Sequence, residues 1–201
     1  MTIFDPTDRE ANLRAAQQSV IREQIEHRVN VFLTKRPKRF AAEGTLDPRI
    51  LNWCRALYRG DAGSLVLVGG IGAGKTWSLW KAGETLIRAG WKGRFEVVDA
   101  YDIKKAARSR DEEQLAKWTG ADFLAIDDVG AVGMQDWDSD NLHGIVNDRW
   151  KAGLPIGLTA NLSEDGEQED LKNLVGPRAA SRLQDEATFV VLRDGDRRRA
   201  K

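Results

Sequence analysis

The sequence predicts an α/β fold in which helices cover both faces of a parallel β-sheet. Short apolar runs alternate with longer helix-like stretches from about residue 64 to residue 192, and a glycine-rich loop joins the first such run to the next helix. Alternating strands and helices are typical of parallel sheets, because the chain must cross back over the sheet, usually through a helix, before it begins the next parallel strand. With 201 residues, of which 41% are hydrophobic, the chain suits one compact domain with a short appendage.

The first 44 residues are interpreted as a helical and basic segment, and residues 45–201 as the main domain. Residues 8–34 predict one or two polar helices, and residues 35–44 a basic, proline-containing connector. The polar helices carry a thin apolar stripe at helical spacing, which we expect to dock on the domain or on a partner. Its members include Val20, Ile25, Val29 and Phe32.

The elements of the main domain follow from periodicity and from helix-start signals. Asp47 and Pro48 predict a helix that begins with a capping carboxylate and a proline and runs to Arg59. We expect strands at residues 64–68, 94–98, 121–126, 154–159 and 188–192. We expect further helices at residues 77–89, 101–110, 111–118, 138–151 and 171–184, the last interrupted at Gly176 and Pro177.

Residues 69–76 read G-G-I-G-A-G-K-T, a complete phosphate loop between a strand and a helix. Such a loop points backbone N–H groups and a helix N-terminus at phosphate oxygens. Lys75 can reach the β- and γ-phosphates, and the Thr76 hydroxyl can bind Mg²⁺. We therefore expect ATP and Mg²⁺ as ligands. The predicted nucleotide-binding residues are Gly69, Gly70, Ile71, Gly72, Ala73, Gly74, Lys75, Thr76 and Trp77.

A pair of carboxylates, Asp127 and Asp128, ends the apolar strand at residues 121–126. We expect this strand to neighbour the phosphate-loop strand. Asp127 would then hold, through water, the Mg²⁺ that Thr76 also binds, and Asp128 would orient or polarise the attacking water. Many ATPases of this kind have the longer Glu at the second position. The shorter Asp128 therefore predicts slow hydrolysis or dependence on a partner.

Three polar residues further along the chain are candidates for contacts with the γ-phosphate. Asn161 follows the strand at residues 154–159, where it can contact the phosphate or the lytic water, or serve only as a turn residue. Arg178 and Arg182 are four residues apart and share a helix face. A guanidinium suits the charge that develops on phosphoryl oxygens, although the pair can also be a solvated basic face.

These motifs together resemble the DnaC-type helicase loaders and the related IstB-type transposition helper ATPases, which are P-loop NTPases of the AAA+ class. The resemblance covers about residues 35–199. Besides the phosphate loop, it rests on R-P-K-R-F (36–40), D-P-R-I-L-N-W (47–53), F-L-A-I-D-D-V-G (123–130), N-D-R-W-K-A-G-L-P-I-G-L-T-A-N (147–161), G-P-R-A-A-S-R-L (176–183) and D-G-D-R-R (194–198). The stretch from Asn147 to Asn161, followed by R-x-x-x-R-L, is its most discriminating part.

The resemblance implies roles for several of these residues. Asn161 takes the sensor-1 position, and Arg182 is the arginine finger that reaches the nucleotide of the next subunit, with Arg178 as an auxiliary contact. Arg197 or Arg198 is a candidate second sensor. The resemblance also implies that no separate helical lid domain follows the ATPase domain.

The function implied is that of an ATP-dependent helicase loader, which binds a replicative DnaB-type helicase and helps place it on single-stranded DNA. Such ATPase modules self-associate into a spiral, and hydrolysis is expected at their interfaces. The alternative within the family is an IstB-like transposition helper, which would bind double-stranded DNA and a transposase. A small-molecule kinase and a binding-only ATP switch also remain open.

Residues for the partners can be suggested from the same pattern. The stripe Val20, Ile25, Val29 and Phe32 is the candidate helicase-binding element. Single-strand binders combine cations with aromatic platforms. The predicted helix at residues 101–110 supplies such a set, although it can also be a solvated helix. Its candidate DNA-binding residues are Tyr101, Lys104, Lys105, Arg108 and Arg110.

Composition excludes several other classes of site. One cysteine, Cys54, rules out an internal disulfide and a cysteine-based zinc site, and we expect it to be a small core residue. His27 and His143 show no metal-ligand spacing. Trp77, Trp80 and Trp150 are expected to pack in the core. No apolar run is long enough for a membrane span or a signal-peptide core. We therefore expect no membrane partner, and the cytoplasm of a bacterial cell or of a phage-infected bacterium.

Overall fold

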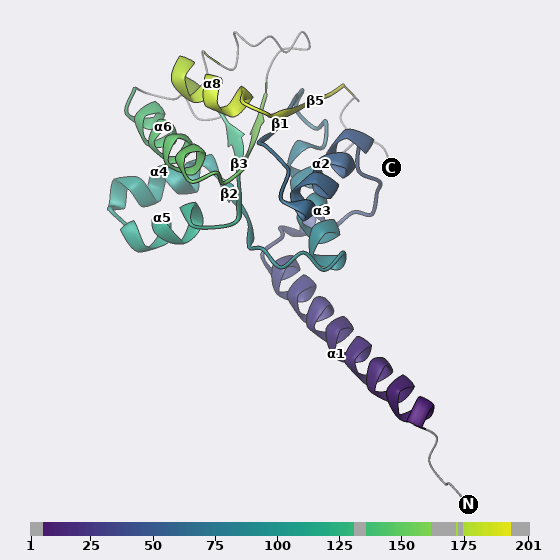
Figure 1. Ribbon diagram of the computed structural model, residues 1–201. Coiled ribbons are helices and arrows are strands. Elements are labelled where there is room, and N and C mark those ends of the chain that lie inside the picture. The colour runs from purple at the N-terminus through teal and green to yellow at the C-terminus, as the bar shows by residue number, and fades with distance from the viewer. Residues whose placement is uncertain (1–5, 131–135, 162–171, 173–174, 194–201) are drawn as a thin grey trace, which may run out of the picture.

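Five parallel strands form the central sheet, in the order β2-β3-β4-β1-β5 (Figure 1). The structure is a computed structural model that describes residues 6–130, 136–161, 172 and 175–193. The strands are β1 (Leu65–Gly69), β2 (Phe95–Asp99), β3 (Phe123–Val129), β4 (Ile156–Ala160) and β5 (Thr188–Leu192). Each predicted strand overlaps an observed one, which confirms the parallel sheet.

The order of the strands corrects one prediction. The strand of the acid pair, β3, does not neighbour the phosphate-loop strand β1, because β4 pairs with both and lies between them. Central strands of a parallel sheet are all apolar, so their composition does not encode which of them are neighbours. With strands about 4.8 Å apart, the ends of β3 and β1 are separated by about 10 Å.

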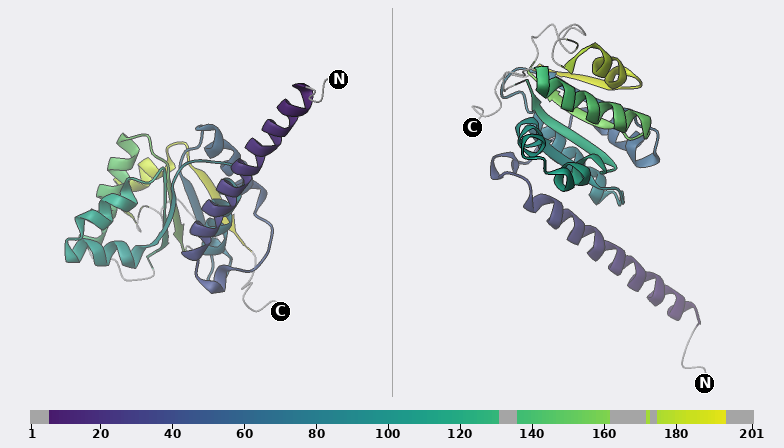
Figure 2. Two further views of the ribbon diagram at one scale, coloured as in Figure 1. Left: turned by 90° about the horizontal axis from the view of Figure 1, so that it is seen from below. Right: turned by 90° about the vertical axis from the view of Figure 1, so that its left-hand side faces the viewer.

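Helices cover both faces of the sheet, as predicted (Figures 1 and 2). Alternate residues of β1 point to opposite faces: Leu65 and Leu67 belong to one buried cluster, and Val66 and Val68 to the other. The first cluster lies under α2 (Pro48–Arg59), α3 (Lys75–Arg88) and the end of α1 (Pro6–Thr34). The second is covered by α4 (Ala100–Ser109), α5 (Glu112–Thr119), α6 (Asp136–Lys151) and α8 (Pro177–Gln184).

Carboxylate caps set the starts of several helices. Asp47 accepts a hydrogen bond from the Arg49 N–H at 2.8 Å, and Pro48 is the first residue of α2, as predicted. Asp99 caps α4 in the same way through the Tyr101 N–H. Cys54 on α2 is buried, which confirms its expected place in the core. Within the described residues, none of the helices is long and apolar enough to cross a bilayer.

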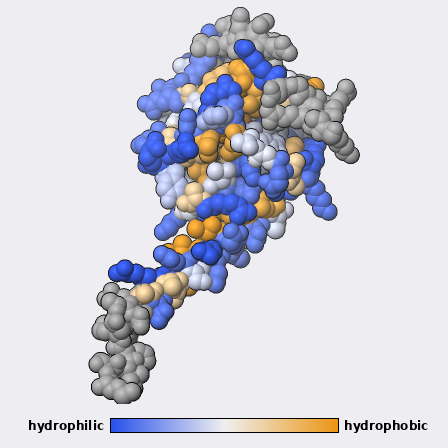
Figure 3. Space-filling view, turned by 90° about the vertical axis from the view of Figure 1, so that its right-hand side faces the viewer, coloured by the Kyte–Doolittle hydropathy of each residue, from blue (hydrophilic) through white to orange (hydrophobic). Residues whose placement is uncertain are grey.

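The first helix, α1, projects from the domain over much of its length (Figure 1). Its 29 residues span about 43 Å at 1.5 Å per residue. Residues 11–24 are exposed, and apolar surface on this projecting part is visible in Figure 3. The exposed apolar side chains on α1 include Leu13, Val20, Ile21 and Val31.

The end of α1 docks on α3, and this docking corrects part of the predicted partner surface. Val29 is fully buried and Phe32 is 5% exposed. The Phe32 ring lies against Gly83 of α3, where a Cβ would approach it to 2.5 Å. Val29 and Phe32 are therefore core residues, so the prediction that their side chains contact a helicase is wrong. Val20 is exposed and Ile25 half-buried. The domain boundary at residue 44 stays a prediction.

Candidate functional site

The phosphate loop curls over the carboxyl end of β1 and leads into the N-terminus of α3. Gly69 has a φ of 147°, and a Cβ there would clash with the carbonyl oxygen of Leu192. Gly74, the residue before α3, has a φ of 94°. Both positions favour glycine, because L side chains rarely adopt these backbone conformations. The glycines of the motif therefore shape the loop that presents the start of α3 to a ligand.

Lys75 is folded into the loop that it follows. Its Nζ donates hydrogen bonds to the carbonyl oxygens of Gly69 and Gly70, both at 2.8 Å, and to Oδ1 of Asn161 at 2.7 Å. The residue is 7% exposed. An ammonium group donates to phosphate oxygens as readily as to carbonyls. The structure thus brings Lys75 and Asn161 together at the carboxyl edge of the sheet.

Asp127 is held by two hydroxyl groups. Its Oδ1 accepts hydrogen bonds from Thr159 Oγ1 at 2.5 Å and from Thr76 Oγ1 at 3.0 Å. Burial raises the pKa of the Asp127 carboxyl, and the two hydrogen bonds oppose that rise. A cation beside this carboxylate would favour its charged form.

The donor atoms at this position fit Mg²⁺. Ligands at 2.0–2.1 Å in an octahedron place neighbouring oxygens about 2.9 Å apart, and Thr76 Oγ1 and Asp127 Oδ1 are 3.0 Å apart. Among the described residues, no group of three or more His, Cys, Asp or Glu side chains is placed to hold a metal. Thr76 and Asp127 would therefore hold the ion together with phosphate and water.

Asp128 occupies a strained position at a bulge. Its φ is 59°, and the pairing of β3 with β4 slips in register between Ile126 and Val129. Such bulges re-aim side chains at the ends of strands. The Asp128 N–H donates to Thr159 Oγ1 at 2.8 Å, and its Oδ1 accepts from Asn161 Nδ2 at 3.2 Å. Asn161 therefore links Lys75 to Asp128.

Thr159 is the residue that sequence reasoning missed. It is 1% exposed, and its hydroxyl fixes both the carboxylate of Asp127 and the backbone of Asp128. The only signal available was a hydroxyl within the apolar strand, two residues before Asn161.

Arg182 lies near the amino ends of the strands, whereas the phosphate loop follows the carboxyl end of β1. These two ends of the sheet are called here its amino edge and its carboxyl edge. Strands β1 and β5 run parallel, with Leu65 beside Thr188 and Gly69 beside Leu192. The helix α8 ends just before β5 starts, so Arg182 is near the amino edge, whereas the loop follows the carboxyl edge. Four steps of β-strand separate the two edges by about 13 Å. The chain therefore does not bring Arg182 to its own phosphate loop.

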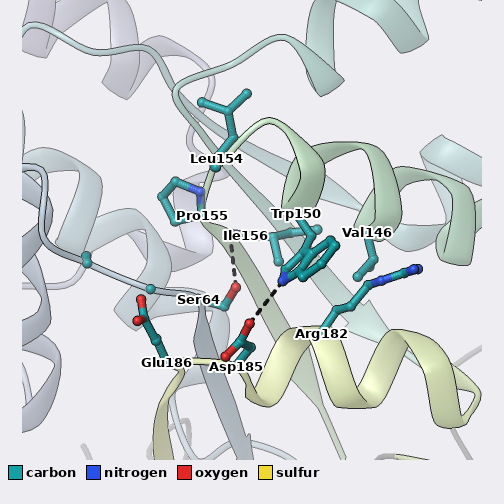
Figure 4. Close-up of a pocket in the computed structure, with 12 residues that line it drawn as sticks. Ser64, Val146, Trp150, Leu154, Pro155, Ile156, Arg182, Asp185 and Glu186 are labelled. Atoms are coloured by element: carbon teal, nitrogen blue, oxygen red, sulfur yellow. Dashed lines mark hydrogen bonds between the residues drawn. The ribbon is translucent and has the colours of Figure 1, made fainter.

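The surroundings of Arg182 form a pocket of about 210 Å³ (Figure 4). Its walls include residues that precede β1, β4 and β5. Nη1 of Arg182 is buried and has no hydrogen-bond partner among the described residues. The Trp150 ring lies 5.2 Å from the guanidinium carbon. Trp150 is 49% exposed, so the prediction that it packs in the core is wrong. Arg178, one turn earlier, is exposed.

The candidate DNA-binding residues lie on or just after α4. Ile103 and Ala106 are buried on the inner side of this helix, whereas Tyr101, Lys105 and Arg108 are exposed on its outer side. Lys104 is half-buried, and Arg110 is the residue that ends the helix with a φ of 56°. The candidate sensors Arg197 and Arg198 lie outside the described residues.

Comparisons with known proteins agree with this geometry. The family model described as IstB-like ATP binding protein matches residues 16–171. Among curated protein sequences, none matches the chain.

Solved structures resemble the fold. A structure described as the DnaC helicase loader is 20% identical, with a TM-score of 0.62 over 78% of this chain and 99% of its own. DnaI is 17% identical, with a TM-score of 0.63 over 81% and 94%. DnaA from Aquifex aeolicus, bound to AMPPCP, is 18% identical, with a TM-score of 0.58 over 75% and 48%.

The phosphate loop with its acid pair, the five-stranded parallel sheet and the family match all lead to one assignment. The chain belongs to the IstB-like ATP-binding family, and its fold is similar to those of the DnaC helicase loader and DnaI.

Proposed function

We propose that this protein hydrolyses ATP with Mg²⁺ at the interfaces of a self-associated assembly, and that it loads a replicative DnaB-type helicase onto single-stranded DNA. It would work in the cytoplasm of a bacterial cell or of a phage-infected bacterium. The proposal rests on the family and on the site. The names of two structural relatives, the DnaC helicase loader and DnaI, support the loader in preference to other roles.

The main support for an ATPase site shared between two subunits is that its parts lie far apart within one subunit. The phosphate loop lies at the carboxyl edge of the sheet and Arg182 at the amino edge. An arginine that acts on phosphoryl oxygens must reach within hydrogen-bond distance of them. Arg182 can meet this requirement only at the nucleotide of another subunit. The site would then be complete only when two protomers are side by side.

Within one protomer the residues divide the chemistry. The loop and Lys75 bind and orient the phosphates, and Thr76 and Asp127 hold Mg²⁺, which would neutralise charge on the β- and γ-phosphates when bound. Asp128 and Asn161, joined by a hydrogen bond of 3.2 Å, would position the attacking water. Asp128 is shorter than the Glu of many such ATPases, so we expect slow turnover that assembly or a partner stimulates.

The nucleotide chemistry is tested by two alanine variants. Arg182→Ala should abolish cooperative ATPase activity and leave nucleotide binding intact, whereas Lys75→Ala should lose both. Arg178→Ala, one turn away on the same helix, removes only the auxiliary contact and should retain more turnover than Arg182→Ala. If Arg182→Ala turned over ATP as fast as the parent protein, the proposal of a trans-acting arginine would be rejected.

Helicase loading is tested by capture. The tagged protein should co-purify with a hexameric replicative helicase in an ATP-dependent manner. The family model's description, IstB-like, supports a transposition helper as the second candidate. Capture of a transposase and preference for double-stranded DNA, without helicase capture, would favour that candidate and reject the loader.

Single-stranded DNA is proposed to contact the outer side of α4. Lys105→Glu should weaken binding and reduce its salt dependence, since each lost phosphate contact removes one released counterion. The matched control is Lys117→Glu on α5, which is also exposed and makes the same change of charge. Equal effects of the two substitutions, or none, would reject this surface.

A further inference from the structure

We propose that Trp150 is a positioning residue for Arg182, holding its guanidinium ready for the nucleotide of the neighbouring protomer. The inference rests on the proposed function, because it adds a residue to the trans-acting half of the site. It starts from an exposed tryptophan that the fold does not need for its core: Trp150 is 49% exposed at the end of α6.

Two contacts fix the Trp150 ring (Figure 4). Its Nε1 donates a hydrogen bond to Oδ2 of Asp185 at 3.1 Å, and its face lies 5.2 Å from the guanidinium carbon of Arg182. A ring at this distance attracts a guanidinium through its quadrupole and restricts its rotamers. The indole is thus held at one end by Asp185 and supports Arg182 with its face.

The same arrangement keeps Arg182 available. Asp185 follows α8 and lines the same pocket as Arg182. In the structure its carboxylate accepts a hydrogen bond from Trp150. Nη1 of Arg182 is buried and has no hydrogen-bond partner among the described residues. A buried, unpaired donor costs free energy, and no ion pair with a described residue would have to break when Arg182 moves out to meet a phosphate.

The carboxylates of the pocket would otherwise compete for the arginine. Asp185 and Glu186 both line it. An arginine drawn into an ion pair with either one would have to break that pair before it reached a phosphate. Trp150 therefore combines two roles, support of the planar cation and capture of Asp185.

The test compares Trp150→Leu, which removes the ring face, with Trp150→Phe, which keeps it. Trp150→Leu should lower the turnover number by about three- to thirtyfold, the range that one ring–guanidinium contact supports. Nucleotide affinity should not change, and Trp150→Phe, which keeps the ring face but loses the hydrogen bond to Asp185, should recover part of the turnover. Tyr58→Leu is the matched control, since Tyr58 is an aromatic residue on α2 with 50% exposure.

Complementation separates positioning from a folding defect. A mixture of Trp150→Leu and Lys75→Ala should turn over more ATP than the sum of the two alone, because Lys75→Ala protomers donate an intact Trp150 and Arg182 to sites that still have Lys75. A general loss of structure in Trp150→Leu would not be rescued in this way.

The outcomes separate this inference from the proposed function. If Arg182→Ala is complemented by Lys75→Ala and Trp150→Leu is not, or if Trp150→Leu turns over ATP like the parent, only the positioning role is rejected. If neither variant is complemented, the shared site itself is rejected. If Trp150→Leu melts at a lower temperature than the parent, Trp150→Phe is tested instead, mixed with Lys75→Ala. The positioning role is rejected if that mixture turns over no more ATP than the sum of the two variants alone.

Discussion

The hydroxyl of Thr159 should matter to both stability and catalysis. Thr159→Val keeps the shape but leaves Asp127 without one donor and the Asp128 N–H without its acceptor. We expect a loss of about 1–3 kcal/mol in the free energy of unfolding, together with a higher Mg²⁺ requirement for turnover. Chemical denaturation and Mg²⁺ titrations measure the two effects. Thr159→Ser retains the hydroxyl and should behave almost like the parent; equal losses in both variants would reject the role of the hydroxyl.

The residues of the site differ in how well the sequence alone predicts them. Lys75, Thr76 and Asp127 were predictable because their chemical types occur at fixed positions relative to a strand and a helix. Thr159 was not, because one hydroxyl in an apolar strand forms no pattern. Arg149 was also missed as a structural residue: it is 2% exposed, and its donors reach backbone carbonyls that include those of Ala121 and Pro155. Such contacts depend on tertiary structure and leave no local signature.

The thiol of Cys54 should be inert in the native protein. Burial raises its pKa to about 12, so at pH 8 only about one molecule in ten thousand holds the reactive thiolate. Iodoacetamide should label the protein in denaturant and not in buffer, as followed by mass spectrometry.

The same shift has a consequence for stability. Because the folded pKa lies above the unfolded one, the contribution of Cys54 is fully present below about pH 8.5 and falls as the pH rises toward 12. A Cys54→Ala variant should lack this decline. In the labelling experiment, rapid reaction of the native protein with iodoacetamide would contradict the burial of the Cys54 side chain.

At the scale of elements, periodicity located every strand to within a few residues but did not give their order. The three central strands of this sheet are mostly apolar, so the insertion of β4 between β3 and β1 has no counterpart in composition. The stripe on α1 poses a related problem. An apolar stripe predicts docking, but it is the same whether the helix docks on its own domain or on a partner. The structure divides it, with Val29 and Phe32 buried and Val20 exposed.

This division predicts two different phenotypes on one helix. Phe32→Ala should lower the free energy of unfolding by about 3–5 kcal/mol, since it empties a site packed against α3. Val20→Asp should leave stability within about 0.5 kcal/mol, because the residue is exposed, and should abolish capture of the helicase. Thermal denaturation and co-purification measure the pair. A stable Phe32→Ala would contradict the docking, and undiminished helicase capture by Val20→Asp would remove α1 from the partner surface.

At the scale of the whole molecule, the two halves of the site face different edges of one sheet. The resemblance predicted this division of labour, since it named Arg182 as a residue for the next subunit. The structure supports it, because Arg182 and its own loop lie at opposite ends of strands that are about 13 Å long. In the proposed assembly, the two halves would form one site when protomers associate side by side.

The most direct test of the shared site is complementation between Lys75→Ala and Arg182→Ala, measured as ATP turnover in mixtures of varied ratio at fixed total protein. The first variant has an intact arginine and a defective loop, and the second has the reverse. The shared site predicts that each is inactive alone and that activity returns in the mixtures, with a maximum at intermediate ratios. Mixtures no more active than the sum of their parts would contradict it.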